Sequence, residues 1–229
     1  MTLITVDGMY SGAMASSPAP IPTGTARGRR MRRTTGDDRE RAILVTAERL
    51  LEERALHEIS VDDLARGAGI SRPTFYFYFS SKEAVLLTLL DRMIEEARER
   101  MGEALERFSE DPPRWLREGI TAIYETFRSH RAVTLAGADA LATSAEVRDL
   151  WSRVMEGWVQ LTTAVIEAER ARGSAPEGVA ARDLAISLNW MNERMLQMTF
   201  AGQTPAVDEE HVLDVLVSVW LGAIYGAPD

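Results

Sequence analysis

Between positions 60 and 82 the chain carries residue types suited to contacting nucleic acid. Arg72 can pair with guanine or with a phosphate, while Thr74 and Tyr76 suit phosphate oxygens and thymine methyl groups. Aromatic residues are concentrated from position 75 to position 79, and an exposed run of them is costly unless it meets a partner. The chemistry that we expect of this segment is therefore recognition of DNA.

Catalytic chemistry has little support in the sequence. The three histidines, His57, His130 and His211, show no metal-ligand spacing, and the chain has no phosphate loop or dinucleotide fingerprint. Without cysteine there is no disulfide framework or thiol chemistry, which is consistent with a reducing cytoplasm. Glu193 beside Asn192 is a candidate buried acid, but no nucleophile accompanies it. We predict a protein that is not an enzyme, with no metal and no cofactor.

Two short helices separated by a glycine turn must position the polar residues. Residues 60–63 (SVDD) form a capping box that predicts a helix running to Ala68, and Ser71 can cap the next helix, with Pro73 in its first turn. Gly69 between them suits the positive φ of a tight turn. This is the geometry of a helix-turn-helix, whose second helix presents its N-terminal residues to base edges. The predicted core is Leu64, Ala65, Ala68, Ile70 and Phe75, and the residues predicted to point outward are Arg72, Thr74, Tyr76 and Tyr78.

Helical periodicity dominates the remainder of the chain. A capping pattern at residues 35–38 predicts the first helix, and a further capping box at residues 80–83 opens a long helix that a proline pair ends at positions 112–113. Further helices are predicted over residues 115–129, 146–172, 180–201 and 208–224. We therefore expect an all-α fold with a disordered basic tail over residues 1–35, a three-helix helix-turn-helix domain over 36–81, and a helical ligand-binding and dimerisation domain over 82–229.

The charge distribution is uneven, although the net charge is −9. Five arginines lie between positions 27 and 33, just before the first predicted helix, whereas the acidic excess lies in the C-terminal part. Two interpretations of the basic segment stay open: a solubilising or processing tail, or a flexible arm that neutralises phosphates or enters a minor groove. The first 26 residues lack the compact apolar core of a signal peptide, and Met9, Met14 and Met31 are candidates for an alternative start.

Bulky side chains recur at helical spacing in the C-terminal part, at Trp151, Met155, Trp158 and Thr162. Such stripes are ordinary core in most proteins. Asn189, Asn192, Glu193 and Leu196, however, share one face of a helix that is otherwise apolar, and buried amides need partners. An apolar slot with one or two amides suits an apolar ligand that carries a carbonyl or ester group. The sequence leaves both interpretations, core and ligand site, open at this point.

The last two predicted helices indicate a partner. The final helix is apolar on two faces, so one face can meet the ligand domain and the other a second subunit, although a fully intramolecular core is the alternative. No window approaches 18 uncharged apolar residues, so we expect no membrane segment and a cytoplasmic location.

Residues 60–79, followed by Ser81, Lys82 and Glu83, resemble the N-terminal domain of TetR-family transcriptional regulators. The resemblance implies a homodimer that binds a palindromic double-stranded operator and responds to a small hydrophobic effector in its C-terminal domain. Pro73 and Tyr78 have a simple packing role as an alternative, and Ser60 matches a phosphate-contacting cap. The positions that fall where the family touches DNA are Ser60, Arg72, Pro73, Thr74, Tyr76, Tyr78 and Lys82.

Almost everything after residue 35 also resembles one member of this family, including residues 85–92 (VLLTLLDR), 164–170 (AVIEAER) and 191–194 (MNER). That member represses a flavin monooxygenase gene and holds its ligand in a long aromatic channel, so the resemblance implies a ligand-released repressor. The alternative is a hydrophobic-ligand carrier or sensor without specific DNA binding. The matching ligand positions are Leu116, Ile123, Phe127, Trp151, Met155, Trp158, Leu161, Thr162, Asn189, Asn192, Glu193, Leu196, Gln197 and Trp220.

The chain departs from that member at four of these positions. Leu116, Ile123, Leu161 and Gln197 stand where the relative is aromatic, so the channel is expected to be wider, more polar at one end, or tuned to another ligand. Trp115 lies one residue before an expected aromatic and replaces it only if the register of the helix shifts.

Overall fold

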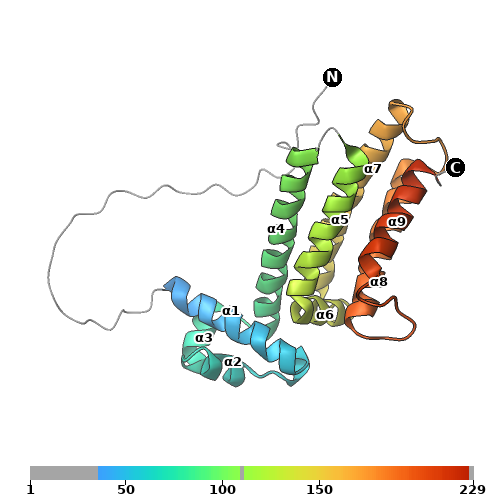
Figure 1. Cartoon of the computed structure of the whole chain (residues 1–229). Coiled ribbons are helices and arrows are strands. Elements are labelled where there is room, and N and C mark those ends of the chain that lie inside the picture. Colours follow the sequence, from blue (N-terminus) through green and yellow to red (C-terminus); the bar gives the residue numbers. More distant parts are fainter. Residues whose placement is uncertain (1–35, 109–110, 227–229) are drawn as a thin grey trace, which may run out of the picture. The chain divides into compact units, whose positions relative to one another are not determined.

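The computed structural model of the protein describes residues 36–108 and 111–226, apart from the side chains of residues 105–108 (Figure 1). Over this part the chain forms nine α-helices and one turn of 3-10 helix, with no strand, which confirms the predicted all-α fold. The predicted tail, residues 1–35, lies outside the described residues. The elements are α1 (Gly36–Glu53), η2 (Leu56–Glu58), α2 (Val61–Gly67), α3 (Arg72–Tyr78), α4 (Lys82–Phe108), α5 (Pro112–Ser129), α6 (Arg131–Ala140), α7 (Ala145–Ala171), α8 (Ala181–Phe200) and α9 (Val212–Tyr225).

The helix-turn-helix forms as its local signals predict. The Ser60 hydroxyl accepts a hydrogen bond from the Asp63 amide at 3.1 Å, and the Asp63 carboxylate accepts one from the Ser60 amide at 3.0 Å, which closes the capping box of α2. Gly69 adopts φ +67° in the turn, and the Ser71 hydroxyl caps α3 by accepting from the Thr74 amide at 3.3 Å. Phe75 is fully buried in the centre of this small core.

Most of the predicted core of this domain is present. Leu64 and Ala65 are buried with Phe75, while Ala68 and Ile70 are half-buried and pack against the same cluster. These contacts fix α3 on α2, and α1 packs on α2, α4 and α6.

The remaining helices form a bundle in which α4 packs on α5, α7 packs on α8, and α9 contacts both α5 and α8. Figure 1 shows α4 leaving the helix-turn-helix region and continuing alongside α5, so one long helix belongs to both parts of the structure. The short α6 contacts α1, α4, α5 and α8. Consequently α4 and α6 are the elements through which the bundle holds the helix-turn-helix domain.

Helix α6 is missing from the predictions, and the reason is tertiary. Its sequence has a buried Val133 and a close approach at Gly137, where a Cβ atom would lie 2.7 Å from a methyl carbon of Leu90 on α4. A ten-residue helix is marginal by itself in water, so packing rather than propensity accounts for it.

Helix α4 begins at Lys82 as predicted, but its cap and the starts of α5 and α9 differ from prediction. The cap of α4 is Ser81, whose hydroxyl accepts from the Ala84 amide at 3.1 Å, so the box predicted from Ser80 to Glu83 is displaced by one residue. Helix α5 begins at Pro112 because the Asp111 carboxylate caps it, and proline is well tolerated in a first turn. Helix α9 begins at Val212, four residues later than predicted.

None of the helices in the described part of the chain has both the length and the apolar character needed to cross a membrane.

Candidate DNA-reading surface and effector cavities

The outward face of α3 carries one cationic and two aromatic side chains. Arg72, Pro73, Tyr76 and Phe77 are all exposed, and they occupy positions i, i+1, i+4 and i+5, which share one side of a helix. Phe77 is 81% exposed and Tyr76 is 46% exposed. Large exposed apolar groups are costly without a partner, so this short helix presents a surface suited to contact with another molecule.

Phe77 is the residue that the sequence predictions missed. They placed Phe75 in the core and Tyr76 and Tyr78 on the outside, and they assigned no side to Phe77. In a helix, Phe77 lies one turn after Pro73 and on the same side, and that spacing is the signal that would have found it.

Thr74 and Tyr78 point outward less than predicted. Thr74 is half-buried, and its hydroxyl oxygen lies 2.8 Å from that of Ser71. Tyr78 is half-buried and packs against the core. Both residues therefore support the outward face of α3 from behind in this structure.

Arg72 is held on the outward face of α3, which we call the reading face, by two partners. Its guanidinium donates to the Asp62 carboxylate at 3.0 Å and to the Tyr76 hydroxyl at 3.3 Å, and it lies 5.7 Å from the centre of the Tyr76 ring. The bond to Tyr76 and the charge of Asp62 raise the pKa of Arg72. Because exposed ion pairs contribute little to stability, Arg72 can exchange Asp62 for another acceptor at small cost.

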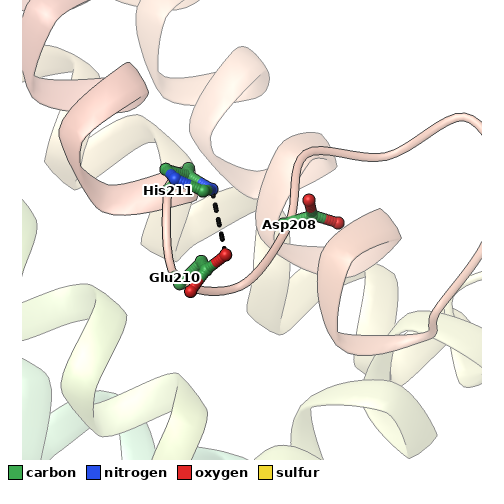
Figure 2. Close-up of side chains that lie close together, drawn as sticks. All are labelled: Asp208, Glu210 and His211. Carbon is green, nitrogen blue, oxygen red and sulfur yellow. Dashed lines mark ion pairs between the residues drawn. The ribbon is translucent and has the colours of Figure 1, made fainter.

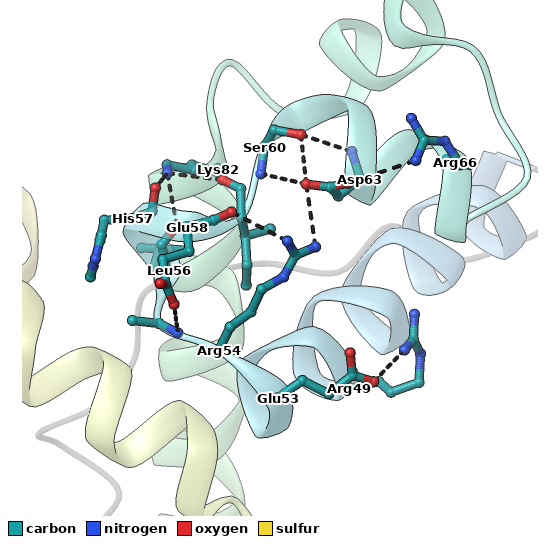
Figure 3. A network of polar contacts seen from close by, with 12 residues as sticks. Arg49, Glu53, Arg54, Leu56, His57, Glu58, Ser60, Asp63, Arg66 and Lys82 are labelled. Atoms are coloured by element: carbon teal, nitrogen blue, oxygen red, sulfur yellow. Dashed lines mark hydrogen bonds and ion pairs between the residues drawn. The ribbon is translucent and has the colours of Figure 1, made fainter.

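Ser60, a predicted phosphate contact, already has partners. Its hydroxyl donates to the Asp63 carboxylate at 2.7 Å and accepts from the Asp63 amide (Figure 3). The hydrogen bonds from Ser60 are the largest cause that lowers the pKa of Asp63, with the charges of Arg54 and Arg66 adding to it. A phosphate at this position would meet the Asp63 charge, so a contact from Ser60 requires a rearranged hydroxyl.

Lys82, the only lysine of the chain, does not face outward as a phosphate contact would. Its ammonium group donates to the backbone carbonyls of Leu56 at 2.7 Å, His57 at 3.2 Å and Ile59 at 2.9 Å (Figure 3). An ammonium group has three donors, and all three are used. Carbonyls at the end of η2 thus hold the charge of Lys82, and the phosphate contact, which stays a prediction, requires Lys82 to release one of them.

The residues predicted to line one ligand channel lie around two cavities. The first is narrow, with space for little more than one water molecule, and is bounded by α4 to α8. The second is similarly narrow and lies between α4, α5, α7, α8 and α9. Of the predicted set, Phe127, Trp151, Glu193, Leu196 and Gln197 line the first cavity, and Leu116, Ile123, Trp158, Leu161, Thr162, Asn189, Asn192 and Trp220 line the second. Met155 is buried but lines neither.

Three aromatic rings lie between these cavities. The ring centres of Phe127 and Trp151 are 6.2 Å apart, those of Phe127 and Trp158 are 6.2 Å apart, and those of Trp151 and Trp158 are 6.0 Å apart. Phe127 and Trp151 line the first cavity, whereas Trp158 lines the second. The residues of the expected channel thus line two separate cavities, and these three rings, here called the aromatic wall, supply part of the lining of each.

The second cavity has buried hydrogen-bonding groups with unused capacity. The Asn189 amide donates to the Thr162 hydroxyl at 3.2 Å and to the Ala185 carbonyl at 2.9 Å, and the Asn192 carbonyl oxygen accepts from the Trp220 indole at 2.9 Å. The indole N–H of Trp115 is buried without a partner among the described residues. Trp115 and Leu116 both line this cavity. Trp115 therefore adds an aromatic ring to its wall while Leu116 keeps its own position there.

Glu193 is the ionisable group of the first cavity. It is half-buried, and burial raises its pKa, with the charge of Arg194 opposing the shift. The indole N–H of Trp151, which lines the same cavity, is also buried without a partner among the described residues.

A cluster of Asp208, Glu210 and His211 lies before α9, and its potential ligand atoms are all within 4.8 Å of one another (Figure 2). The Nδ1 atom of His211 is 3.7 Å from a carboxylate oxygen of Glu210. All three residues are exposed, and exposed acidic groups commonly occur without a metal, so we assign no metal to this cluster.

Comparison with known proteins identifies the family. The family model described as bacterial regulatory proteins of the tetR family matches residues 43–89, and the C-terminal domain model of transcriptional regulator EthR matches residues 116–226. The HTH-type transcriptional regulator EthR of Mycobacterium tuberculosis is 57% identical over 217 residues, which cover 93% of this chain and 97% of that protein. The chain belongs to the TetR family.

Other TetR-family proteins agree with this assignment. EthR of Mycolicibacterium smegmatis is 52% identical over 204 residues, covering 89% of this chain and 94% of that protein. A crystal structure of a TetR-family regulator from Syntrophomonas wolfei has the same fold, with a TM-score of 0.68 at 18% identity over 83% of this chain and 97% of the other. The chain is therefore a DNA-binding transcriptional regulator of the TetR type rather than an enzyme.

The role of Lys82 generates the first testable prediction. In Lys82→Met, three backbone carbonyls lose a charged donor, so the free energy of unfolding should fall by roughly 1–3 kcal/mol. The slope of log affinity for DNA against log salt concentration should stay unchanged. Urea denaturation and salt titrations of DNA binding measure the two effects.

Arg66→Met is the matched control, because the Arg66 side chain is 79% exposed and its removal should leave stability unchanged. A Lys82 variant of normal stability whose salt slope falls by about one would instead show that this lysine neutralises a phosphate.

Proposed function

We propose that this TetR-family regulator is a homodimeric repressor that holds a palindromic operator through α3 and leaves it when a small apolar ligand enters the effector domain. Residues 36–81 would read DNA, and residues 82–229 would bind the ligand and the second subunit. The observation that carries the proposal is the outward face of α3, where Arg72, Tyr76 and Phe77 are exposed together on one short helix.

The chemistry of this face suits the major groove. Arg72 is within reach of guanine or phosphate once it leaves Asp62, and Tyr76 offers a hydroxyl to a phosphate oxygen. Phe77 adds an apolar surface for a thymine methyl group, with Pro73 beside it. Thr74 and Tyr78 would contribute to DNA binding by supporting α3 and through the part of each side chain that stays exposed. Ser60 would contact DNA after its hydroxyl changes partner.

Dimerisation through α8 and α9 is supported by apolar side chains of these helices that are exposed in the single subunit. Trp190 on α8 is 47% exposed and Val219 on α9 is 41% exposed, whereas Leu216, Val217 and Trp220 of α9 are buried within the subunit. A two-fold dimer built on these helices would present two copies of α3 to DNA. Recognition helices that bind successive major grooves lie about 34–36 Å apart. The operator would then be palindromic.

The cavities favour an effector with an apolar body and one hydrogen-bond acceptor. Their walls are mostly aliphatic and aromatic, and the Trp115 indole offers an unused donor at the second cavity. A ketone or ester oxygen would satisfy such a donor. Binding would shift the population of the dimer toward a spacing of the reading helices that the operator does not accept.

The regulated gene is a further part of the proposal. Since the chain resembles EthR along almost its whole length, we propose a flavin monooxygenase gene as the first target to test, with a cytoplasmic site of action.

The alternative, a carrier or sensor of hydrophobic ligands without specific DNA binding, would share the cavities but would have no use for the exposed face of α3. Fluorescence anisotropy separates the two functions, with labelled DNA from upstream of the protein's own gene and its divergent neighbour. Saturable binding that survives excess unrelated DNA supports the repressor. No binding, or binding that the competitor removes, favours the carrier.

The reading face generates a second prediction. The double variant Tyr76→Ala with Phe77→Ala should lower affinity for the specific DNA at least about tenfold, because both exposed aromatic side chains of α3 are lost. Its oligomeric state and ligand affinity should be unchanged. Val45→Ala, which removes an exposed apolar group from α1, is the control and should bind DNA normally. Retained affinity in the double variant would mean that α3 is not the reading helix.

The cavities generate a third prediction, which compares two ligands of similar length. Methyl octanoate should bind about tenfold more tightly than decane, because its carbonyl can accept a hydrogen bond from a buried donor while the hydrocarbon leaves that donor unsatisfied. Quenching of tryptophan fluorescence measures both affinities, since Trp151 and Trp158 lie at the cavity walls. Equal affinities would indicate that the cavities select by shape alone.

A further inference from the structure

His130 joins three helices at the corner between α5 and α6. Its Nδ1 atom lies 2.8 Å from a carboxylate oxygen of Glu48 on α1, and its Nε2 atom lies 3.1 Å from one of Glu96 on α4. The three side chains are each between 28% and 37% exposed. One imidazole ring therefore connects the first helix of the DNA-reading domain to the long helix and to the effector domain.

Both ring contacts are hydrogen bonds only when the imidazole is protonated. An ionised carboxylate can only accept, and a neutral imidazole has a single N–H donor. Burial lowers the pKa of His130, but the hydrogen bonds to Glu48 and Glu96 outweigh burial, so the net shift is upward from 6.5.

Among the described residues, Glu48 and Glu96 are the charges that act on this ring. Arg100 on α4 pairs with Glu96 at 2.7 Å. Arg131, the next residue along the chain, is directed to the carbonyl of Phe200 and to Glu209, and Arg128 pairs with Glu125. The local group thus consists of two carboxylates that face His130 and one arginine that shares Glu96.

The same corner carries two residues of the first cavity. Phe127 lies three residues before His130 on α5, and Thr134 lies four residues after it on α6. The Thr134 hydroxyl donates to the Phe127 carbonyl at 3.2 Å, and the Thr134 amide donates to the His130 carbonyl at 2.9 Å. A ligand that displaces either cavity residue would consequently move the backbone that holds the imidazole.

We propose that His130, Glu48 and Glu96 form an ionic latch that couples the first cavity to the DNA-reading domain and that opens as the pH rises. The latch holds α1 against α4 and α6 in the ligand-free arrangement. Its effect on the operator rests on the proposed repressor function, whereas its effect on stability does not.

The direction of the pH effect follows from proton linkage. The pKa of His130 is higher in the latched state than in the open or unfolded state, so the latch contributes fully below about pH 6.5. Its contribution is lost as the pH rises through the pKa of the latched state. Each unit of difference in pKa between the two states corresponds to a tenfold change in the equilibrium.

The experiment compares the full-length wild type with His130→Gln and Glu48→Gln between pH 6 and pH 8.5. NMR titration of the imidazole C–H signals, assigned through single His→Gln variants, should give His130 a pKa above 6.5 that falls in Glu48→Gln. The urea concentration at the unfolding midpoint should be higher for the wild type than for His130→Gln, and this difference should shrink as the pH rises. His211→Gln, which removes an exposed histidine, should follow the wild type.

Operator binding supplies the second readout. Affinity of the wild type should fall by about tenfold from pH 6.5 to pH 8.5, with a much smaller fall in His130→Gln. The latch is overturned if His130 titrates at or below 6.5, or if both proteins show the same pH dependence of stability. Absence of specific DNA binding at every pH would contradict the repressor function, and the NMR and urea data would still decide the latch.

Discussion

The candidate DNA-reading surface on α3 depends on the burial of one side chain, Phe75. A helix of seven residues cannot maintain itself in water, so α3 exists because Phe75 is held in a core built by α1 and α2. Pro73 and the Ser71 cap fix where the helix begins, and the half-buried Thr74 and Tyr78 brace it from behind. With these side chains anchored, the opposite side of the helix is left to carry Arg72, Tyr76 and Phe77, which packing does not need.

The helical bundle after residue 82 shows the opposite arrangement, in which two narrow gaps remain between packed side chains. Protein cores are normally filled to the density of organic crystals, and unfilled space reduces stability. This domain nevertheless keeps two cavities on either side of the rings of Phe127, Trp151 and Trp158. A ligand that fills this space would recover lost contacts, and the cost of moving the aromatic wall would determine which ligands are large enough to join the cavities. The corner at His130 lies where such a movement would reach α1.

The parts of the structure that could be predicted from sequence are those that local chemistry determines. Capping residues and Gly69 set the limits of α2 and α3, and the amide-bearing face of α8 is buried as its periodicity indicates. Helix α6 could not be predicted because its packing on Leu90 comes from a distant helix. The partners of Lys82 and His130 lie 23 to 82 residues away along the chain, so only the fold reveals them. For the same reason the aromatic wall between the cavities could not be inferred from a single helix face.

The central claim is that ligand in the effector domain changes the separation of the two DNA-reading domains in a dimer. The chain has no cysteine, so Arg66→Cys gives one exposed site for a spin label on α2 of each subunit. Pulsed electron paramagnetic resonance then measures the distance between the two labels. The account predicts a single narrow distance that operator DNA leaves unchanged and that saturating methyl octanoate displaces or broadens. The absence of any distance between labels, or a distribution that the bound ligand does not alter, would contradict it.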